Sequence, residues 1–205
     1  MSNDRFDLTK GQRFNLSKGG DTNFFISLEW DEPTQRNGVS YDLDASVFAC
    51  SYNSKQQPKI VSDGHFVYYG RAPKPGEPFA SSDNAIHHSG DQTSGDRDGE
   101  QVRVYLDRLD KRVEIMSVVV TIHKALARKQ NFGDVANATI RVFNMDEAGD
   151  PLQELFAFDL KGDYSNYTAV HFGDIYLNES GDWEWISHGR GFERTELGDI
   201  VNIYC

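Results

Sequence analysis

The feature that most constrains this chain is a repetition of short, alternating apolar runs without helices between them. Each run is bounded by Gly, Asp, Asn or Pro, a pattern typical of β-strands and their turns. Strands are predicted at residues 13–16, 24–30, 43–50, 65–69, 101–106, 113–123, 138–144, 153–160, 169–176 and 183–188. Parallel βαβ units need a helix between successive strands, so the pattern favours an all-β fold, a two-sheet antiparallel β-sandwich.

Two segments depart from this pattern, and a third extends it. Residues 124–130 are rich in helix formers and are followed by Asn131-Phe132-Gly133, which predicts a helix of roughly two turns. Residues 70–99 contain three prolines and few apolar side chains, so we expect a long connection without regular structure. The apolar run at 200–204 is predicted to add a last strand.

Size and charge restrict the class of protein. A chain of 205 residues is expected to form one domain with a substantial core. Its net charge of -11 repels nucleic acids and anionic lipids unless cations intervene, so no direct nucleic-acid partner is expected. The amino terminus lacks the features of a secretory signal, and no apolar run is long enough to span a bilayer. We therefore expect a cytoplasmic protein.

The two cysteines fit a reducing compartment. Cys50 lies in an apolar strand pattern and is predicted to be a buried, reduced thiol, whereas Cys205 is the last residue. A disulfide between them is not expected, because cytosolic thiols stay reduced.

Two acidic segments carry the chemistry. Asp42 and Asp44 open the apolar run at 43–50, and on a strand their side chains point to the same side about 6.6 Å apart. Residues 90–100 combine glycines with further carboxylates, at Asp91, Asp96, Asp98 and Glu100. Oxygen-rich groups of this kind suit a hard divalent cation such as Ca²⁺.

Other interpretations of these residues stay open. Loops rich in Asp, Gly and Ser are also common solvated turns, and the spacing of an EF-hand is absent. The pair His87-His88 has no cysteine or third histidine at ligand spacing, which favours exposed loop imidazoles over a zinc site. His123 and His171 lie in apolar runs and are interpreted as core or edge residues. Arg128 and Lys129 could bind an anion such as tellurite or phosphate, but a solvated helix face with salt bridges is favoured.

The chain resembles the TerD-type family of bacterial tellurium-resistance and stress-response proteins. The resemblance rests on residues 8–16, 28–31, 41–48, 62–69, 88–95, 100–102, 120–123, 127–137, 158–160 and 168–176. It implies one TerD-like domain over 1–205, with a core at about 7–192 and a C-terminal extension at 193–205. It also implies a β-sandwich that binds two Ca²⁺ ions at one end. Carried over by position, the metal ligands are Asp42, Asp44, Asp91, Asp96, Asp98 and Glu100. Family members often have a third aspartate where this chain has Ser40.

We expect a calcium-binding stress-response protein that is not an enzyme. It would act as a scaffold or sensor for other proteins of a stress-response complex, in the cytoplasm or against anionic lipid of the inner membrane through bound calcium. One alternative is a metal-dependent phosphoester hydrolase that uses the same carboxylates. Another is direct tellurite chemistry at Cys50 and Cys205. No nucleophile elbow or phosphate-binding glycine loop is present in the sequence.

Overall fold

The structure, a computed structural model, describes residues 6–31, 39–70, 79–90 and 99–205. The strands are β1 Phe6–Leu8, β2 Arg13–Asn15, β3 Asn23–Asp31, β4 Leu43–Tyr52, β5 Pro58–Ile60, β6 Phe66–Tyr68, β7 Phe79–Ala80, β8 Ile86–His88, β9 Gln101–Tyr105, β10 Ile115–Ile122, β11 Ala136–Met145, β12 Pro151–Asp159, β13 Tyr167–Leu177 and β14 Trp183–Glu193. The helices are α1 Ala125–Arg128 and α2 Leu197–Tyr204, with short 3-10 turns at Ser17–Gly19, Asp63–His65, Leu106–Arg108 and Phe132–Asp134.

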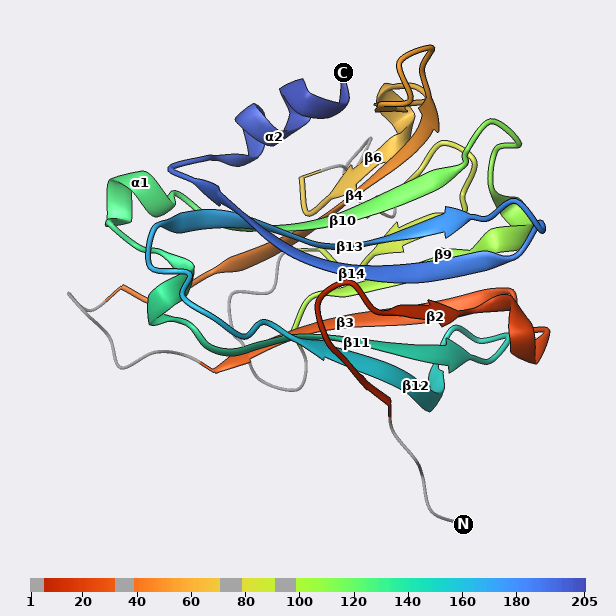
Figure 1. Ribbon diagram of the computed structural model, residues 1–205, viewed down its shortest axis with the longest axis horizontal. Helices are drawn as coiled ribbons and strands as arrows, with labels where there is room; N and C mark the ends of the chain where they lie inside the picture. Colours follow the sequence, from red (N-terminus) through yellow and green to blue (C-terminus); the bar gives the residue numbers. More distant parts are fainter. Residues whose placement is uncertain (1–5, 32–38, 71–78, 91–98) are drawn as a thin grey trace.

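The strands form two sheets that pack face to face (Figure 1). Sheet A has the order β1-β12-β11-β3-β9-β8-β7. Sheet B has the order β2-β14-β13-β10-β4-β5, and β6 also pairs with β4. The neighbouring strands are antiparallel, except that β1 runs parallel to β12. The predicted antiparallel β-sandwich is confirmed, and each of the ten predicted runs overlaps a strand.

The core lies between the inner faces of the two sheets. Trp185 is fully buried there and packs against Phe156, with ring centroids 5.5 Å apart. Gly173 of the neighbouring strand makes room for this ring, because a Cβ atom at that position would lie 2.4 Å from it. Trp183, on the same strand as Trp185, packs at the margin of the core. Both tryptophans of β14 therefore pack against the core between the sheets.

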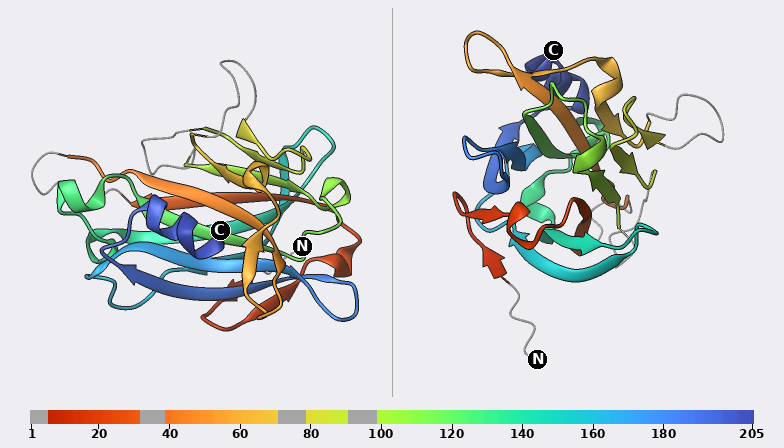
Figure 2. Two further views of the ribbon diagram at one scale, coloured as in Figure 1. Left: turned by 90° about the horizontal axis from the view of Figure 1, so that it is seen from above. Right: turned by 90° about the vertical axis from the view of Figure 1, so that its right-hand side faces the viewer.

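Strand β10 is buried along its whole length because both of its faces are covered. Met116 and Val118 face the core between the sheets, whereas Ile115 and Val119 belong to a smaller cluster on the outer face of sheet B. Helix α2 lies across this outer face, as the view from above shows (Figure 2). Cover on both faces explains why β10 is a nearly continuous apolar run rather than an alternating one.

The predicted last strand at 200–204 is wrong, because this segment forms the second half of α2. Glu196 and Asp199 form a capping box that starts the helix. Ile200 and Tyr204, four residues apart, share one helix face and are both buried. The ring of Tyr204 stacks on Phe48 of β4 with a centroid distance of 4.3 Å. Helical spacing of the apolar residues outweighs the strand preference of the β-branched ones.

The segment 70–99 also differs from the prediction. It contains β7 and β8, which extend sheet A beyond β9, and Ile86 of β8 is fully buried. The predicted helix at 124–130 is present in shorter form as α1. Within the four described ranges, no helix combines the length and the apolar character needed to cross a bilayer.

Candidate metal centre

Asp42 and Asp44 flank the first residue of β4, at the end of sheet B where β10 finishes. The backbone of Asp42 is fixed by the N–H of His123, which donates to the Asp42 carbonyl at 2.8 Å. The neighbouring Tyr41 is buried, and its hydroxyl donates to Asp134 at 3.0 Å. Asp44 pairs with Thr121 in the ladder, and only 3% of its surface is exposed. This local framework holds both carboxylates at one end of the sandwich.

Glu100 brings a third carboxylate to the same place from the other sheet. It directly precedes β9 of sheet A, and its surface is 1% exposed. Its Oε2 atom accepts a hydrogen bond of 2.5 Å from the N–H of Ala45 in β4. Moving a carboxylate out of water costs roughly several kcal/mol unless hydrogen bonds or a cation replace the lost water. The hydrogen bond from Ala45 replaces part of it.

His88 completes the contact between the two sheets. Its Nε2 lies 3.1 Å from the Ala45 carbonyl oxygen and 3.3 Å from Glu100 Oε2, and its Nδ1 accepts from the N–H of Gly90 at 3.0 Å. Since Nδ1 accepts this hydrogen bond, it is unprotonated, and Nε2 carries the ring N–H and donates. The prediction that His88 is an exposed loop residue is therefore wrong, because His88 is buried and lies on β8. The signal in the sequence is Ile86, because residues two apart on a strand share one face.

Two nitrogen-bearing side chains flank the aspartates. Arg128 of α1 has its Nη1 3.8 Å from Asp42 Oδ2. His123 has its Nδ1 3.6 Å from Asp44 Oδ2 and 3.4 Å from the Tyr69 hydroxyl. The sequence predicted salt bridges for Arg128 without naming Asp42 as the partner. It assigned His123 to the core or an edge and did not predict its contact with Asp44. The two residues follow β10 in the chain, which ends beside the start of β4.

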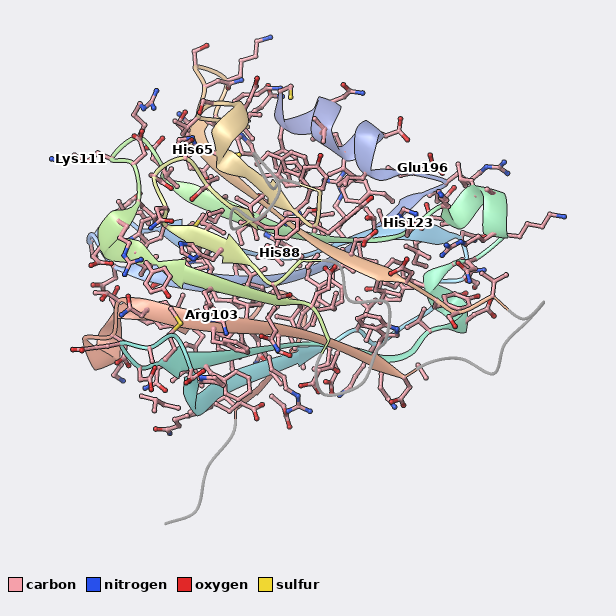
Figure 3. The ribbon with its side chains drawn as sticks, turned by 180° about the vertical axis from the view of Figure 1, so that it is seen from behind. His65, His88, Arg103, Lys111, His123 and Glu196 are labelled. Carbon is pink, nitrogen blue, oxygen red and sulfur yellow. The ribbon has the colours of Figure 1, made fainter. Side chains whose placement is uncertain are left out.

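A cavity of about 190 Å³ lies beside this group. Asp44 and His123 line one side of it, and Glu196, at the start of α2, lines another. Figure 3 shows His123 and Glu196 next to each other, and His88 on the neighbouring sheet. The aspartate end of the site is therefore adjacent to the amino end of α2.

The donor chemistry fits a hard cation. Asp42, Asp44 and Glu100 offer carboxylate oxygens from two sheets, the ligand type that Ca²⁺ prefers. Three further predicted ligands, Asp91, Asp96 and Asp98, lie outside the described residues. The chain leaves the described part after Gly90 and returns at Gly99, directly before Glu100.

The thiols are placed as expected. Cys50 is fully buried and Cys205 is exposed, and both are free. Burial raises the pKa of the Cys50 thiol to about 12, with a smaller contribution from the charge of Asp174. A thiol of this kind is a poor nucleophile and a poor metal ligand at neutral pH.

Comparison with known proteins identifies the family. A model of the TerD domain matches residues 5–204. The tellurium resistance protein TerD of Serratia marcescens is 35% identical over 189 residues, which cover 90% of each chain. General stress protein 16U of Bacillus subtilis (strain 168) is 33% identical over 190 residues, covering 91% of this chain and 90% of the relative.

A solved structure shows the same fold. The crystal structure of a homologue of telluride resistance protein TerD from Streptomyces coelicolor A3(2) matches with a TM-score of 0.62 and 23% identity, covering 87% of this chain and 94% of that one. The names of the relatives describe resistance and stress proteins and mention no reaction. This protein therefore belongs to the TerD domain family, whose named members include tellurium resistance and general stress proteins.

Proposed function

We propose that this protein binds calcium at its acidic end and acts as a calcium-dependent scaffold or sensor in a stress response of the tellurium-resistance type. The observation that carries the proposal is the contact between Glu100 and the start of β4, where Asp42 and Asp44 lie. Glu100 precedes β9 of sheet A, and it accepts a hydrogen bond from the N–H of Ala45, the residue that follows Asp44 in sheet B. Buried carboxylates at such a junction are costly unless a cation or hydrogen bonds compensate them.

The proposed ligand set extends these three carboxylates with the acidic residues that join β8 to β9. Ca²⁺ takes six to eight oxygen ligands at about 2.3–2.6 Å. Three carboxylates that each bind through one oxygen supply only part of this number. Two ions are proposed, held by Asp42, Asp44, Asp91, Asp96, Asp98 and Glu100.

Calcium would act by exchanging contacts. In the structure Asp42 lies near Arg128, and Asp44 lies near His123. When the aspartates bind calcium, their contacts with Arg128 and His123 are weakened. The end of β10 and helix α1 then respond to the ion, and the changed surface is offered to a protein partner in the cytoplasm.

Isothermal titration of Ca²⁺ into chelator-stripped protein, with millimolar Mg²⁺ present, tests the binding step. We expect two equivalents of Ca²⁺ and a rise in melting temperature. Asp42→Asn with Asp44→Asn should abolish the stabilisation. The matched control is Glu147→Gln with Glu179→Gln, which removes two charges from exposed positions elsewhere and should leave calcium binding unchanged. Equal stabilisation of the aspartate variant and the wild type would contradict the assignment.

The scaffold role needs a separate test. Tagged protein is recovered from stressed cells in calcium or in chelator, and the proteins bound to it are compared. We expect partners that depend on calcium and are lost in the Asp42→Asn, Asp44→Asn variant but kept in the Glu147→Gln, Glu179→Gln control. Identical partners in calcium and in chelator would refute a calcium-dependent scaffold even if calcium binds.

A further inference from the structure

A second group of ligating side chains lies on the outer face of sheet B. His171 and Asp174 come from β13, and His188 comes from β14. His171 Nε2 lies 2.8 Å from Asp174 Oδ1, and His188 Nε2 lies 2.7 Å from Asp174 Oδ2. One potential ligand atom from each residue lies within 4.8 Å of the others.

This group is distinct from the acidic end. Asp174 is opposite Ser117 on β10, whereas Asp44 is opposite Thr121. The two ladder positions are therefore about 13 Å apart along the strand, at about 3.3 Å per residue. The ligand types differ as well, since this group has two imidazoles and one carboxylate.

A β-bulge brings the three residues together. His171 and Asp174 are three apart, and on a regular strand they would point to opposite faces. The pairing of β13 with β14 shifts register between His171 and Gly173, and the pairing with β10 shifts at the same place. On β14 the bulge falls at His188-Gly189, where the glycine has a φ of +55°. The bulge redirects side chains so that both histidines reach the same carboxylate.

Asp174 is a buried carboxylate whose two oxygens both accept hydrogen bonds. Its surface is 7% exposed, and burial by itself would raise its pKa. Hydrogen bonds from His171, His188 and Ser117 outweigh the burial and keep the pKa of Asp174 well below its ordinary value. Ser117 also lies beside Tyr204 of α2, so the Asp174 carboxylate is backed by the residues between sheet B and this helix. Supporting contacts of this kind orient ligands in metal sites.

Solvent reaches the group from one side. The side chain of His188 is 33% exposed, compared with 13% for His171 and 10% for Asp174. An ion can therefore enter beside His188 without separating the sheets.

We propose that His171, Asp174 and His188 form a binding site for one divalent ion of the first transition row, with Zn²⁺ as its representative. Two imidazole nitrogens and one carboxylate oxygen, with a further position open to water, form a known ligand set for such ions. In the structure the N–H at each Nε2 donates a hydrogen bond to the carboxylate, because an ionised carboxylate can only accept one. On binding, each imidazole takes the tautomer protonated at Nδ1, and the ion takes the place of the two hydrogen bonds.

The competing interpretation is a purely structural triad, in which the histidines only satisfy the hydrogen bonds of a buried carboxylate. Both interpretations predict that loss of Asp174 destabilises the fold, so stability alone does not separate them. Measured metal binding by folded protein does separate them.

The test is calorimetric titration of Zn²⁺ into chelator-stripped full-length protein in saturating Ca²⁺, which occupies the acidic end. We expect one equivalent of Zn²⁺, weakened at least about tenfold in His188→Gln and in His171→Gln, as loss of a ligand should exceed the loss of a supporting contact. His87→Gln is the matched control and should bind as the wild type does, and so should Asp42→Asn with Asp44→Asn. Co²⁺ provides a second readout through its visible absorption, which should disappear in His188→Gln.

Two results would overturn the proposal. One is the absence of saturable Zn²⁺ binding by the wild type, which would leave the triad as a structural feature. The other is equal Zn²⁺ affinity in wild type and in both histidine variants while their melting curves show a folded protein. Loss of binding in His87→Gln would also overturn it, because the ion would then be held elsewhere.

Discussion

The substitution Ile200→Ala tests whether α2 is an integral part of the sandwich. Ile200 is fully buried between α2 and the outer face of sheet B, in a cluster with Phe48, Val119 and Ala169. Removing three carbon atoms loses about 2.4 kcal/mol of transfer free energy at about 0.8 kcal/mol per methylene. The cavity left behind adds to this, so we expect the free energy of unfolding to fall by about 2–4 kcal/mol.

Ile203→Ala is the matched control, with the same substitution in the same helix. Ile203 is 46% exposed, and alanine has the higher helix propensity, so we expect a change within about 0.5 kcal/mol. Urea denaturation followed by far-UV circular dichroism measures both variants. The corresponding fall in melting temperature for Ile200→Ala is roughly 4–16 °C for a domain of this size. Equal losses in the two variants, or a loss below about 0.5 kcal/mol for Ile200→Ala, would refute the packing described for α2.

Two further predictions concern a half-buried carboxylate and the thiols. Burial alone would raise the pKa of Asp83, but hydrogen bonds from Ser81 and from the Asp110 N–H lower it, so this carboxylate stabilises the fold above its ordinary pKa. Asp83→Asn should therefore lower the free energy of unfolding by about 1–3 kcal/mol at pH 7. In urea denaturation, the difference between wild type and variant should become smaller below about pH 4, where the wild-type carboxylate takes up a proton. A difference that does not change with pH would contradict this. In native protein at pH 8 a thiol reagent should label Cys205 and leave Cys50 unreacted until denaturant is added, as read by mass spectrometry, whereas rapid native labelling of both would disprove the burial of Cys50.

The strands were predictable because their alternation is local. The run 43–50, for example, became β4 with the expected start at Leu43. The helix at 200–204 was missed because β-branched Ile200 and Ile203 favour a strand locally. When Leu197 is included, the spacing of Leu197, Ile200 and Tyr204 follows the helical period. This shared apolar face favours a helix over a strand.

The two candidate sites show the same limit. The resemblance predicts that Asp42, Asp44 and Glu100 lie at one end of the sandwich, and in the structure Glu100 contacts the backbone of Ala45, the residue after Asp44. The triad around Asp174 was missed because its three-residue spacing from His171 looks wrong for a strand. A bulge changes that spacing, and bulges depend on two neighbouring strands rather than on one local pattern.

The contact at Ala45 has a consequence for how the protein behaves in a crowded solution. The N–H and C=O of one residue point to the same side of a strand, and at Ala45 they point to the edge of β4 just beyond the end of β6. A free pair of this kind is a template on which a strand of another molecule can add. Glu100 and His88 take both groups with side chains, so the carboxylate proposed to bind calcium also seals an open edge of the sheet. Loss of Glu100 would therefore uncover a place where copies of the chain can join by strand addition.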